Sequence, residues 1–396
     1  LPNDFFKQAD KMSFQEIAFL ASKNLFLSDI PQDTLEAFVH EVLNFDVPLV
    51  ELDKQFYALE LFHGPTCAFK DFAARFMARL FGWFAEKSQQ AITILVATSG
   101  DTGSAVAHGF LNVKGIKVII LYPSGKVSPL QEKQLTGMGG NVTALEVLGT
   151  FDDCQKLVKQ AFLDKELKEK MILASANSIN IARLLPQSFY YLYLAAQLNK
   201  KGKSVVVSVP SGNFGNLTAG LIAKIMGAPI SKFVASTNRN NVVPKYLQTG
   251  EFKPKPSFST ISNAMDVGNP SNFSRMLDLC DNDVAKMRKD IYGASFSDEE
   301  TKEAISSVYK QYNYIMDPHG AVAYLGLLDF MENNLELVGV FLETAHPAKF
   351  SDEVAKAIHQ PVLIPDRLKI YIDREKRAVL LGNSFSELKD FLMGVW

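Results

Sequence analysis

Lys70 is the residue whose surroundings in the sequence most favour chemistry. It stands between aromatic residues, where a turn containing glycine and proline (residues 63–66) gives way to a helical pattern. Apolar side chains recur every four residues in that pattern, which predicts one apolar helix face: Phe72, Phe76, Leu80 and Phe84. Apolar surroundings disfavour the ammonium form of a lysine, and the neutral amine attacks carbonyl carbon, so Lys70 is a candidate Schiff-base lysine. The alternative is an ordinary solvated lysine near a helix start, the commoner state of lysines.

A second candidate is a small polar loop that follows an apolar run and opens a helical pattern. It consists of Ser211, Gly212, Asn213, Phe214, Gly215 and Asn216. Glycines let a backbone approach an anion closely, and a helix N-terminus offers free N–H groups. The loop is therefore a candidate phosphate cup without a charged side chain. A plain helix-capping turn explains the same residues equally well.

A third candidate lies in the same strand–loop–helix context and consists of Ser99, Gly100, Asp101, Thr102 and Gly103. This loop is a candidate site for a carboxylate or a phosphate. The side chain of Asp101 partly opposes that interpretation, because a carboxylate repels an anion.

Asn177, Ser178 and Arg183 follow a further apolar run and combine amide, hydroxyl and guanidinium donors. Such a set suits a phosphate monoester. Taken alone, Arg183 is more often a surface ion-pair partner.

Thr344 follows a late apolar run and supplies a hydroxyl. A lysine at an apolar helix mouth, a glycine–asparagine cup and this hydroxyl are together the parts needed to hold pyridoxal phosphate. The lysine forms the Schiff base, the cup binds the 5′-phosphate, and the hydroxyl can hydrogen-bond the pyridine nitrogen without strongly favouring its protonation. His319 and His346 are possible acid–base groups, but structural histidines are the commoner case and we assign neither.

The elements that position these loops alternate between buried strands and helices. Continuous apolar runs of strand length are found at residues 92–97, 118–122, 141–147, 172–174, 204–209, 232–236 and 337–342. Alternation of this kind predicts parallel sheets covered on both faces, and in open α/β sheets ligands bind beyond the carboxyl ends of the strands. We therefore expect an α/β protein with two doubly wound open-sheet domains.

The expected division has three parts. Residues 1–91 form a helical N-terminal part and the start of the large domain, including the lysine helix. Residues 92–185 form the small α/β domain. Residues 186–396 complete the large domain, with a loop-rich lid or connection at 238–275 and a C-terminal strand (368–372) and helix (384–392).

Composition excludes several classes of function. The chain has 396 residues, 47% hydrophobic and 21% charged, with a net charge of −2, so neither nucleic acid nor an anionic membrane is expected as partner. No apolar run is long enough to span a membrane, and the start lacks a signal pattern. Three scattered cysteines indicate no disulfide framework, the histidines show no metal-ligand spacing, and a cytoplasmic setting fits best. Neither a dinucleotide fingerprint nor a P-loop occurs.

Taken together, these segments closely resemble the threonine synthases, in particular their shorter bacterial branch. That family belongs to the tryptophan-synthase-β-like (fold type II) group of pyridoxal phosphate enzymes. The resemblance covers most of the chain and rests on residues 60–76 (ELFHGPTCAFKDFAARF), 98–104 (TSGDTGS), 121–131, 175–183 (SANSINIAR), 208–220 (SVPSGNFGNLTAG), 263–266 (NAMD) and 343–350 (ETAHPAKF).

The resemblance implies a reaction and roles for the residues. The reaction is conversion of O-phospho-L-homoserine and water to L-threonine and phosphate, by γ-elimination followed by β-addition of water. Lys70 would be the Schiff-base lysine and proton shuttle, residues 212–216 would bind the cofactor phosphate, and Thr344 its ring nitrogen. Residues 99–103 would hold the substrate carboxylate near the cofactor O3′. The substrate phosphate would be bound by Asn177, Ser178, Arg183 and Thr102.

Some alternatives remain at this stage. Another lyase of the same fold, such as a phospholyase or a dehydratase, would use most of the same residues, and so would a catalytically inactive ligand-binding homologue. Many relatives carry asparagine where this chain has Asp101, and an ionised aspartate would repel a phenolate O3′. Asp101 or O3′ must then carry a proton, or the side chain points away. The oligomer expected is a monomer or a homodimer.

Overall fold

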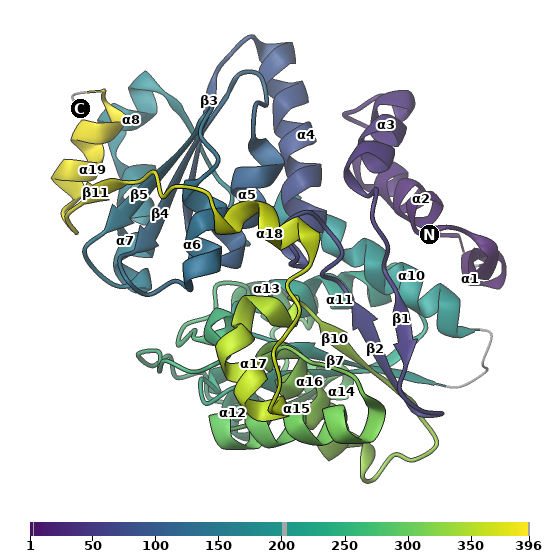
Figure 1. Cartoon of the computed structure of the whole chain (residues 1–396). Helices are drawn as coiled ribbons and strands as arrows, with labels where there is room; N and C mark the ends of the chain where they lie inside the picture. Colours follow the sequence, from purple (N-terminus) through teal and green to yellow (C-terminus); the bar gives the residue numbers. More distant parts are fainter. Residues whose placement is uncertain (3, 200–203, 395–396) are drawn as a thin grey trace. The chain divides into compact units, whose positions relative to one another are not determined.

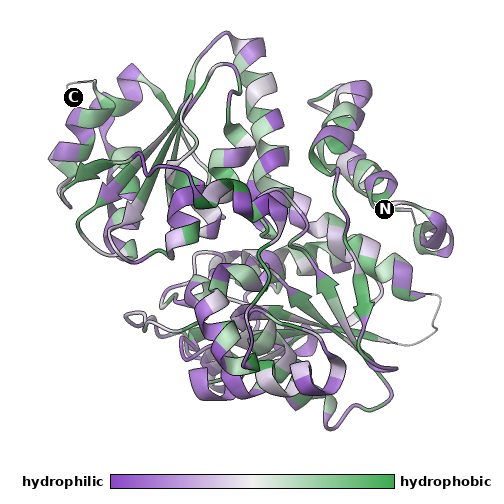
Figure 2. Ribbon diagram, viewed as in Figure 1, coloured by the Kyte–Doolittle hydropathy of each residue, from purple (hydrophilic) through white to green (hydrophobic). Residues whose placement is uncertain are grey.

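The computed structural model describes residues 1–2, 4–199 and 204–394 and divides into two compact units (Figure 1). Unit 1 comprises Leu1–Gly64 and Leu184–Leu363. Unit 2 comprises Pro65–Arg183 and the chain from Ile364 onward. Each unit has its own sheet, whose apolar strands stand out in Figure 2. In the part of the chain described, no helix combines the length and apolarity needed to cross a membrane, and no acidic, histidine and cysteine side chains cluster as metal ligands do.

Unit 2 contains a five-stranded parallel sheet in the order β11-β5-β4-β3-β6. The central strands β3, β4 and β5 are rich in β-branched residues and largely buried on both faces, which explains their continuous apolar runs, whereas the edge strands β6 and β11 are partly exposed. Their bounds are β3 Ile92–Ala97, β4 Ile116–Pro123, β5 Val142–Val147, β6 Ile172–Ser175 and β11 Val379–Leu381.

Helices cover both faces of this sheet. On one face, the side chains of Ile94 and Val118 pack against α4 (Lys70–Ser88) and α5 (Asp101–Phe110). On the other face, Leu95 and Ile119 pack against α7 (Phe151–Leu163) and α19 (Phe385–Leu392). The remaining helices of unit 2 are α6 Pro129–Thr136, α8 Lys165–Lys170, α18 Asp366–Ile372 and most of α9 Ile181–Leu184.

Unit 1 contains a six-stranded sheet in the order β1-β2-β10-β7-β8-β9, in which β1 alone is antiparallel to its neighbour. Its strands are β1 Leu49–Glu51, β2 Phe56–Glu60, β7 Val205–Pro210, β8 Ile230–Thr237, β9 Ile291–Ser295 and β10 Val338–Glu343. The loop after β7 carries the predicted cup, and Thr344 follows β10, the neighbouring strand. The sheet therefore brings the two segments to one edge.

Helices also cover both faces of the sheet of unit 1. On one face, Val206 and Phe341 pack against α15 (Asp298–Tyr312) and α16 (Pro318–Met331). On the other, Tyr191 of α10 (Ser188–Asn199) contacts Phe233 of β8, with ring centroids 5.8 Å apart, beside α11 (Gly215–Ile225). The other helices are α1 Phe5–Gln8, α2 Phe14–Phe26, α3 Gln32–Val42, α12 Val242–Thr249, α13 Phe273–Leu279, α14 Val284–Asp290 and α17 Ser351–Ile358. Short 3-10 turns lie at η1 Ala9–Lys11, η2 Leu185–Gln187, η3 Asn263–Met265 and η4 Pro347–Phe350.

The structure confirms two doubly wound α/β sheets but divides the chain differently from the expectation. The lysine helix α4 belongs to unit 2, because its apolar face packs on β3 and β4. The C-terminal segment also belongs to unit 2, where β11 pairs with β5. The assignment of this tail to the large domain is therefore wrong. No local sequence pattern indicates that a C-terminal strand pairs with a strand formed much earlier in the chain.

The expected strand at 368–372 is also wrong, since Asp366–Ile372 is the helix α18. Leu368 and Tyr371, three residues apart, are buried, whereas Ile370 is exposed. The alternating pattern of Leu-Lys-Ile-Tyr-Ile resembles a strand, but packing uses the helical period. Strands β9 and β11 were not foreseen, and residues 238–275 contain α12, η3 and the start of α13.

Candidate active site

The turn before α4 is held by the residue that follows Lys70. Asp71 is fully buried, and its carboxylate accepts hydrogen bonds from the backbone N–H and the hydroxyl of Thr66, both at 2.8 Å. This fixes the start of the helix, so Lys70 stands at its first residue. The Phe-Lys-Asp segment therefore combines a candidate reactive amine with the carboxylate that anchors its backbone.

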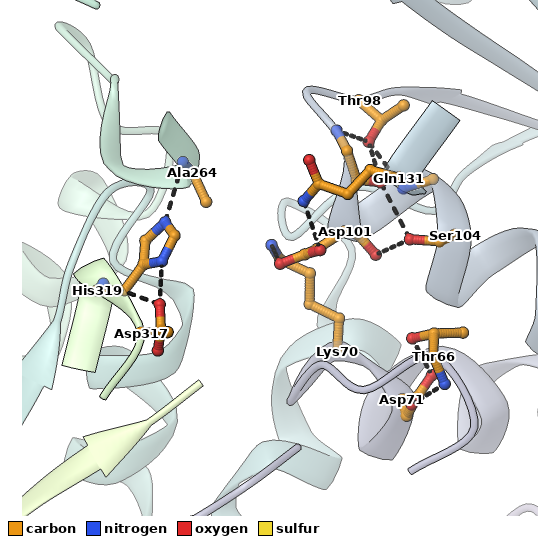
Figure 3. Close-up of polar contacts among 12 residues, drawn as sticks. Thr66, Lys70, Asp71, Thr98, Asp101, Ser104, Gln131, Ala264, Asp317 and His319 are labelled. Carbon is orange, nitrogen blue, oxygen red and sulfur yellow. Dashed lines mark hydrogen bonds and ion pairs between the residues drawn. The ribbon is translucent and has the colours of Figure 1, made fainter. Parts of the chain in front are cut away.

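The amine of Lys70 lies in a largely enclosed setting. Its Nζ is 3.9 Å from Oδ2 of Asp101, and the two side chains are 15% and 3% exposed (Figure 3). Nζ also lies 5.3 Å from the centroid of the Phe69 ring. The alternative of an ordinary solvated lysine is therefore wrong.

Asp101 does not point away from Lys70, and a second group holds it in place. Nε2 of Gln131 donates a hydrogen bond of 2.7 Å to Oδ1 of Asp101 (Figure 3). Gln131 belongs to none of the predicted site loops and follows Asp101 by 30 residues in the sequence. The contact between Gln131 and Asp101 follows from the pairing of β3 with β4, because the loops after neighbouring parallel strands lie at the same edge of the sheet.

The shape of the loop at 98–103 is set by Thr98 and by glycines. The hydroxyl of Thr98 accepts the N–H groups of Gly100 at 3.0 Å and of Gly103 at 2.7 Å. Gly100 has φ +141°, which favours glycine, and a Cβ on Gly103 would lie 2.6 Å from Cγ2 of Thr98. Ser99 and Thr102 are half-buried on this loop.

Asn177 ties two strand-end loops together. Its Oδ1 accepts the N–H of Ala97 at 3.2 Å, and its Nδ2 donates to the Ala97 carbonyl at 2.7 Å. The carboxamide thus joins the loop after β6 to the end of β3, a structural role that sequence reasoning missed. Ser178 beside it is half-buried.

Arg183 is 2% exposed, so the interpretation as a surface ion-pair partner is wrong. Its Nη1 donates a hydrogen bond of 2.5 Å to the carbonyl of Ala176. Burial lowers the pKa of Arg183 to about 10, while the nearby carboxylate of Asp71 acts in the opposite direction. The guanidinium remains a cation at neutral pH, in a setting where its electrostatic attraction is little screened.

The cup in unit 1 is formed by backbone rather than by charges. Phe214 has φ +58°, and α11 begins at the next residue. A Cβ on Gly212 would lie 2.7 Å from the carbonyl oxygen of Ala264 in η3, so only glycine fits there. The backbone carbonyl of Asn213 accepts the Nδ2–H of Asn272 at 3.0 Å. The loop is therefore firmly placed on both sides.

Two atoms beside this cup have no hydrogen-bond partner among the described residues. They are Nδ2 of Asn216 and Oδ1 of Asn263, and both atoms are buried. Oδ1 of Asn216, in contrast, accepts the hydroxyls of Tyr190 and Tyr191, both at 2.6 Å. Buried polar atoms are normally paired, so the cup offers polar groups that a bound polar ligand can satisfy. A phosphate group can accept a hydrogen bond from Nδ2 of Asn216, whereas Oδ1 of Asn263 is itself an acceptor. Thr344, 6% exposed, supplies the expected hydroxyl.

Comparisons with known proteins agree with this geometry. A family model described as pyridoxal-phosphate dependent enzyme matches residues 43–336, and a threonine synthase C-terminal model matches residues 321–392. The threonine synthase of Haemophilus influenzae is 48% identical over 92% of this chain and 85% of that protein. The chain belongs to the threonine synthase family.

Solved structures of the family share the whole architecture. The crystal structure of threonine synthase from Escherichia coli superposes with a TM-score of 0.93 and 41% identity, covering 100% of this chain and 91% of that one. The PLP-bound threonine synthase from Brucella melitensis gives 0.92 and 32%, with the same coverage. The fold type II architecture and the pyridoxal phosphate cofactor expected from the sequence are thereby confirmed.

The predicted site residues fall into two groups within the threonine synthase fold. Unit 2 holds Lys70, residues 99–103, Asn177, Ser178 and Arg183, and unit 1 holds residues 212–216 and Thr344. Sequence reasoning missed Asp71 and Gln131, which hold the predicted residues in place. It also left His319 unassigned, although this histidine is 3% exposed and lies in a polar row beside η3 (Figure 3).

Proposed function

We propose that this chain converts O-phospho-L-homoserine and water to L-threonine and phosphate. The observation that carries the proposal is the enclosed Lys70, at the first residue of a helix and 3.9 Å from Asp101, in a chain of the threonine synthase family. Pyridoxal phosphate, when bound, supplies a ring that withdraws electrons and so stabilises negative charge on the substrate carbons. The residues of the chain do the rest.

Lys70 is the group that moves protons. Its amine lies at the mouth of α4, where Asp101 and the ring of Phe69 leave it little contact with water. We assign to it removal of the protons at Cα and then Cβ of the substrate. Phosphate then leaves from Cγ, protons return to Cγ and Cα, and water adds its hydroxyl at Cβ.

The loop at 99–103 holds the substrate carboxylate in this proposal. It presents backbone N–H groups at the start of α5, with a shape fixed by the hydroxyl of Thr98. Asp101 faces Lys70 rather than the open side of the loop, and Gln131 keeps it there. The positive charge of Lys70 compensates the negative charge of Asp101. This pairing weakens the repulsion between Asp101 and the substrate anion.

Arg183 is the cation for the leaving phosphate, with Ser178, Asn177 and Thr102 as neutral partners. A buried guanidinium attracts a dianionic phosphate strongly, and more so as negative charge grows on the leaving group. Asn177 contributes chiefly by fixing the loop, since its amide already bonds both backbone groups of Ala97.

In unit 1, residues 212–216 would bind the cofactor phosphate, and the hydroxyl of Thr344 would donate a hydrogen bond to the ring nitrogen. Neither segment carries a charged side chain. A hydroxyl beside the ring nitrogen, unlike a carboxylate, does not favour protonation of that nitrogen. Gly212 permits the close backbone approach, and the buried Nδ2 of Asn216 is a donor among the described residues that still lacks an acceptor.

The cellular location and the oligomeric state of the protein are predictions. The substrate is a small molecule, and the three cysteines, all buried and none in a disulfide, support a reducing cytoplasmic location. We expect a monomer or a homodimer. A phospholyase or dehydratase on the same fold, and an inactive homologue, are the competing functions that an assay must separate.

The test is phosphate release from O-phospho-L-homoserine, with threonine and 2-oxobutyrate measured together, for the wild type and Lys70→Ala. We expect threonine and phosphate in equal amounts from the wild type and a loss of at least about a thousandfold in Lys70→Ala. Release of phosphate with 2-oxobutyrate instead of threonine would make the protein a phospholyase. A yellow protein that releases no phosphate would overturn the assignment of the phosphate site.

A further inference from the structure

A row of polar groups in unit 1 ends on the turn that supports the cup. Nδ1 of His319 lies 2.5 Å from Oδ1 of Asp317, and Nε2 lies 3.2 Å from the backbone N of Ala264 (Figure 3). The ring is 3% exposed, and its other neighbour is Phe350, edge-on with centroids 4.9 Å apart. The imidazole thus spans from the start of α16 to η3.

The two contacts define the protonation of the imidazole. A backbone N–H can only donate, so Nε2 of His319 must be an acceptor and carries no hydrogen. Nδ1 therefore carries the hydrogen and donates it to Asp317. A doubly protonated ring would place two N–H groups face to face at Ala264, in a buried site that cannot satisfy them. The geometry requires one neutral tautomer.

Asp317 is itself held by its position. Its carboxylate caps α16 by accepting the N–H groups of His319 at 2.8 Å and Gly320 at 3.3 Å. Its own N–H donates at 3.3 Å to Glu343, the last residue of β10. Burial, and then the charge of Asp317, raise the pKa of Glu343 well above its usual range, which favours the uncharged form of Glu343.

At its other end the row reaches the cup. Ala264, whose N–H is held by His319, directs its carbonyl at Gly212, where an added Cβ would lie only 2.7 Å from that oxygen. The next residue, Met265, has its Cα 2.9 Å from the same point. Any shift of η3 therefore changes the space beside Gly212. Glu343 directly precedes Thr344, so the row also begins at the second proposed cofactor contact.

We propose that His319 is a positioning residue for the cofactor. As a neutral imidazole oriented by Asp317, it holds the turn Asn263–Met265 against Gly212 and so fixes the cup in the shape that binds the cofactor phosphate. This inference rests on the proposed role of residues 212–216. It assigns His319 no contact with substrate and no proton transfer in the reaction.

The test uses two replacements that reproduce different nitrogens of the ring. Glutamine reaches as far as Nε2 and can still accept the N–H of Ala264. Asparagine reproduces only Nδ1 and leaves that N–H unpaired. After the cofactor is removed, pyridoxal phosphate is titrated into the wild type, His319→Gln and His319→Asn by fluorescence, and hydrogen exchange of residues 258–268 is followed by mass spectrometry.

We expect His319→Asn to weaken cofactor affinity about tenfold or more and to speed exchange at η3 in the cofactor-free protein, as an unpaired buried N–H predicts. His319→Gln should stay within about threefold of the wild type. His108→Asn replaces a half-buried histidine in unit 2 and should change neither readout. Equal losses in the two His319 variants, or no loss in either, would overturn the inference.

A measurement on the unmodified protein separates this inference from the proposed function. The nitrogen NMR spectrum of histidine-labelled wild type should show His319 with hydrogen on Nδ1 and none on Nε2. A charged ring or the opposite tautomer would overturn the inference even if both variants fail to fold. A wild type that does not bind pyridoxal phosphate would overturn the proposed function instead.

Discussion

The two groups of strand-end loops differ in how they handle charge. In unit 2, the loops hold a largely enclosed amine, a buried carboxylate and a buried guanidinium: Lys70, Asp101 and Arg183. In unit 1, the cup and its support consist of glycine backbone, amides, a hydroxyl and a neutral imidazole, with the carboxylate of Asp317 beside the imidazole. In the proposed function, the side where protons move and a phosphate departs carries several fixed charges, and the side that holds the cofactor binds it mainly through dipoles.

The difference follows from the cost of burying charge. A buried charge is tolerated only with a partner of opposite sign or several hydrogen bonds. Unit 2 supplies such partners, since Asp101 lies beside Lys70 and Asp71 attracts Arg183. In unit 1, burial and the charge of Asp317 raise the pKa of Glu343, which favours its uncharged form. Backbone dipoles need no counter-charge, so the cup itself needs no buried ion.

Removing the buried cation of unit 2 should have the largest effect. Arg183→Gln loses the positive charge proposed to attract the substrate phosphate and leaves the Asp71 carboxylate with less compensation. We expect kcat/KM for O-phospho-L-homoserine to fall about a hundredfold or more, with the cofactor spectrum retained. Steady-state kinetics and absorbance measure the two effects separately.

Arg183→Lys is the matched control for that prediction. It keeps the charge but loses the planar fork, so its loss should lie between those of the wild type and Arg183→Gln. If the glutamine variant keeps near-normal kinetics, charge at this position does not distinguish unit 2 from unit 1.

The neutral cup should instead be sensitive to shape. Gly212→Ala places a methyl group 2.7 Å from the carbonyl oxygen of Ala264, so the cup or η3 must move. We expect a loss of cofactor affinity of about tenfold to a hundredfold, measured by titrating the cofactor-free protein, because overpacking of this kind costs about 1–3 kcal/mol.

Gly250→Ala provides the comparison within unit 1. Gly250 ends α12 with φ +80°, and nothing lies within 4 Å of an added Cβ. Its replacement should cost about 1 kcal/mol of stability through the backbone alone and leave cofactor affinity unchanged. Equal effects at the two glycines would show that Gly212 is not a contact of the cofactor.

Asp101→Asn tests whether unit 2 needs this negative charge or only a hydrogen-bond acceptor. The asparagine oxygen can still accept the Nε2–H of Gln131, now at 2.7 Å from Oδ1, while the 3.9 Å ion pair with Lys70 is lost. Because a pair at that distance is a weak contact, we expect activity to stay within about tenfold of the wild type.

Asp101→Leu removes charge and acceptor together and should reduce activity about a hundredfold, since Gln131 is left buried without its acceptor. Phosphate release measures both variants. An asparagine variant as inactive as the leucine variant would mean that the carboxylate itself takes part in the reaction.

The sequence predicts those parts of this molecule that depend on local pattern. Continuous apolar runs located seven of the eleven strands of the described chain, and strand–loop–helix punctuation marked Lys70, the cup and the loop at 99–103 as candidates. The resemblance supplied the reaction. Tertiary packing, which the local sequence does not encode, determines where the short strands β9 and β11 form. It also decides that residues 366–372 form the helix α18 instead of a strand.

The supporting contacts are harder to predict because they join distant positions. Gln131 reaches Asp101 over 30 residues, and Asn177 reaches Ala97 over 80. His319 reaches Ala264 over 55 residues. Polar residues with such partners look like ordinary surface residues in a sequence, as Arg183 did. A burial pattern known only after folding decides which of them are structural.

One further carboxylate near the cup is expected to titrate, and it predicts the smallest effect. Asp266 directly follows η3 and accepts hydrogen bonds from Asn238, Asn240 and Thr260. Burial nevertheless raises its pKa from 3.8 to about 6. Between these two values the folded state binds more protons than the unfolded state, so this group makes the free energy of unfolding fall as pH rises from about 4 to 6.

Asp266→Asn should remove that contribution. Measured by urea unfolding between pH 4 and 6.5, the stability of the variant relative to the wild type should increase with pH, by at most about 1 kcal/mol per pH unit after solvent screening. The lost charge-assisted hydrogen bonds shift the whole curve but not its slope. If the two curves run parallel, Asp266 is ionised throughout. The cup would then be stabilised by a charge after all, and the contrast with unit 2 would be one of degree.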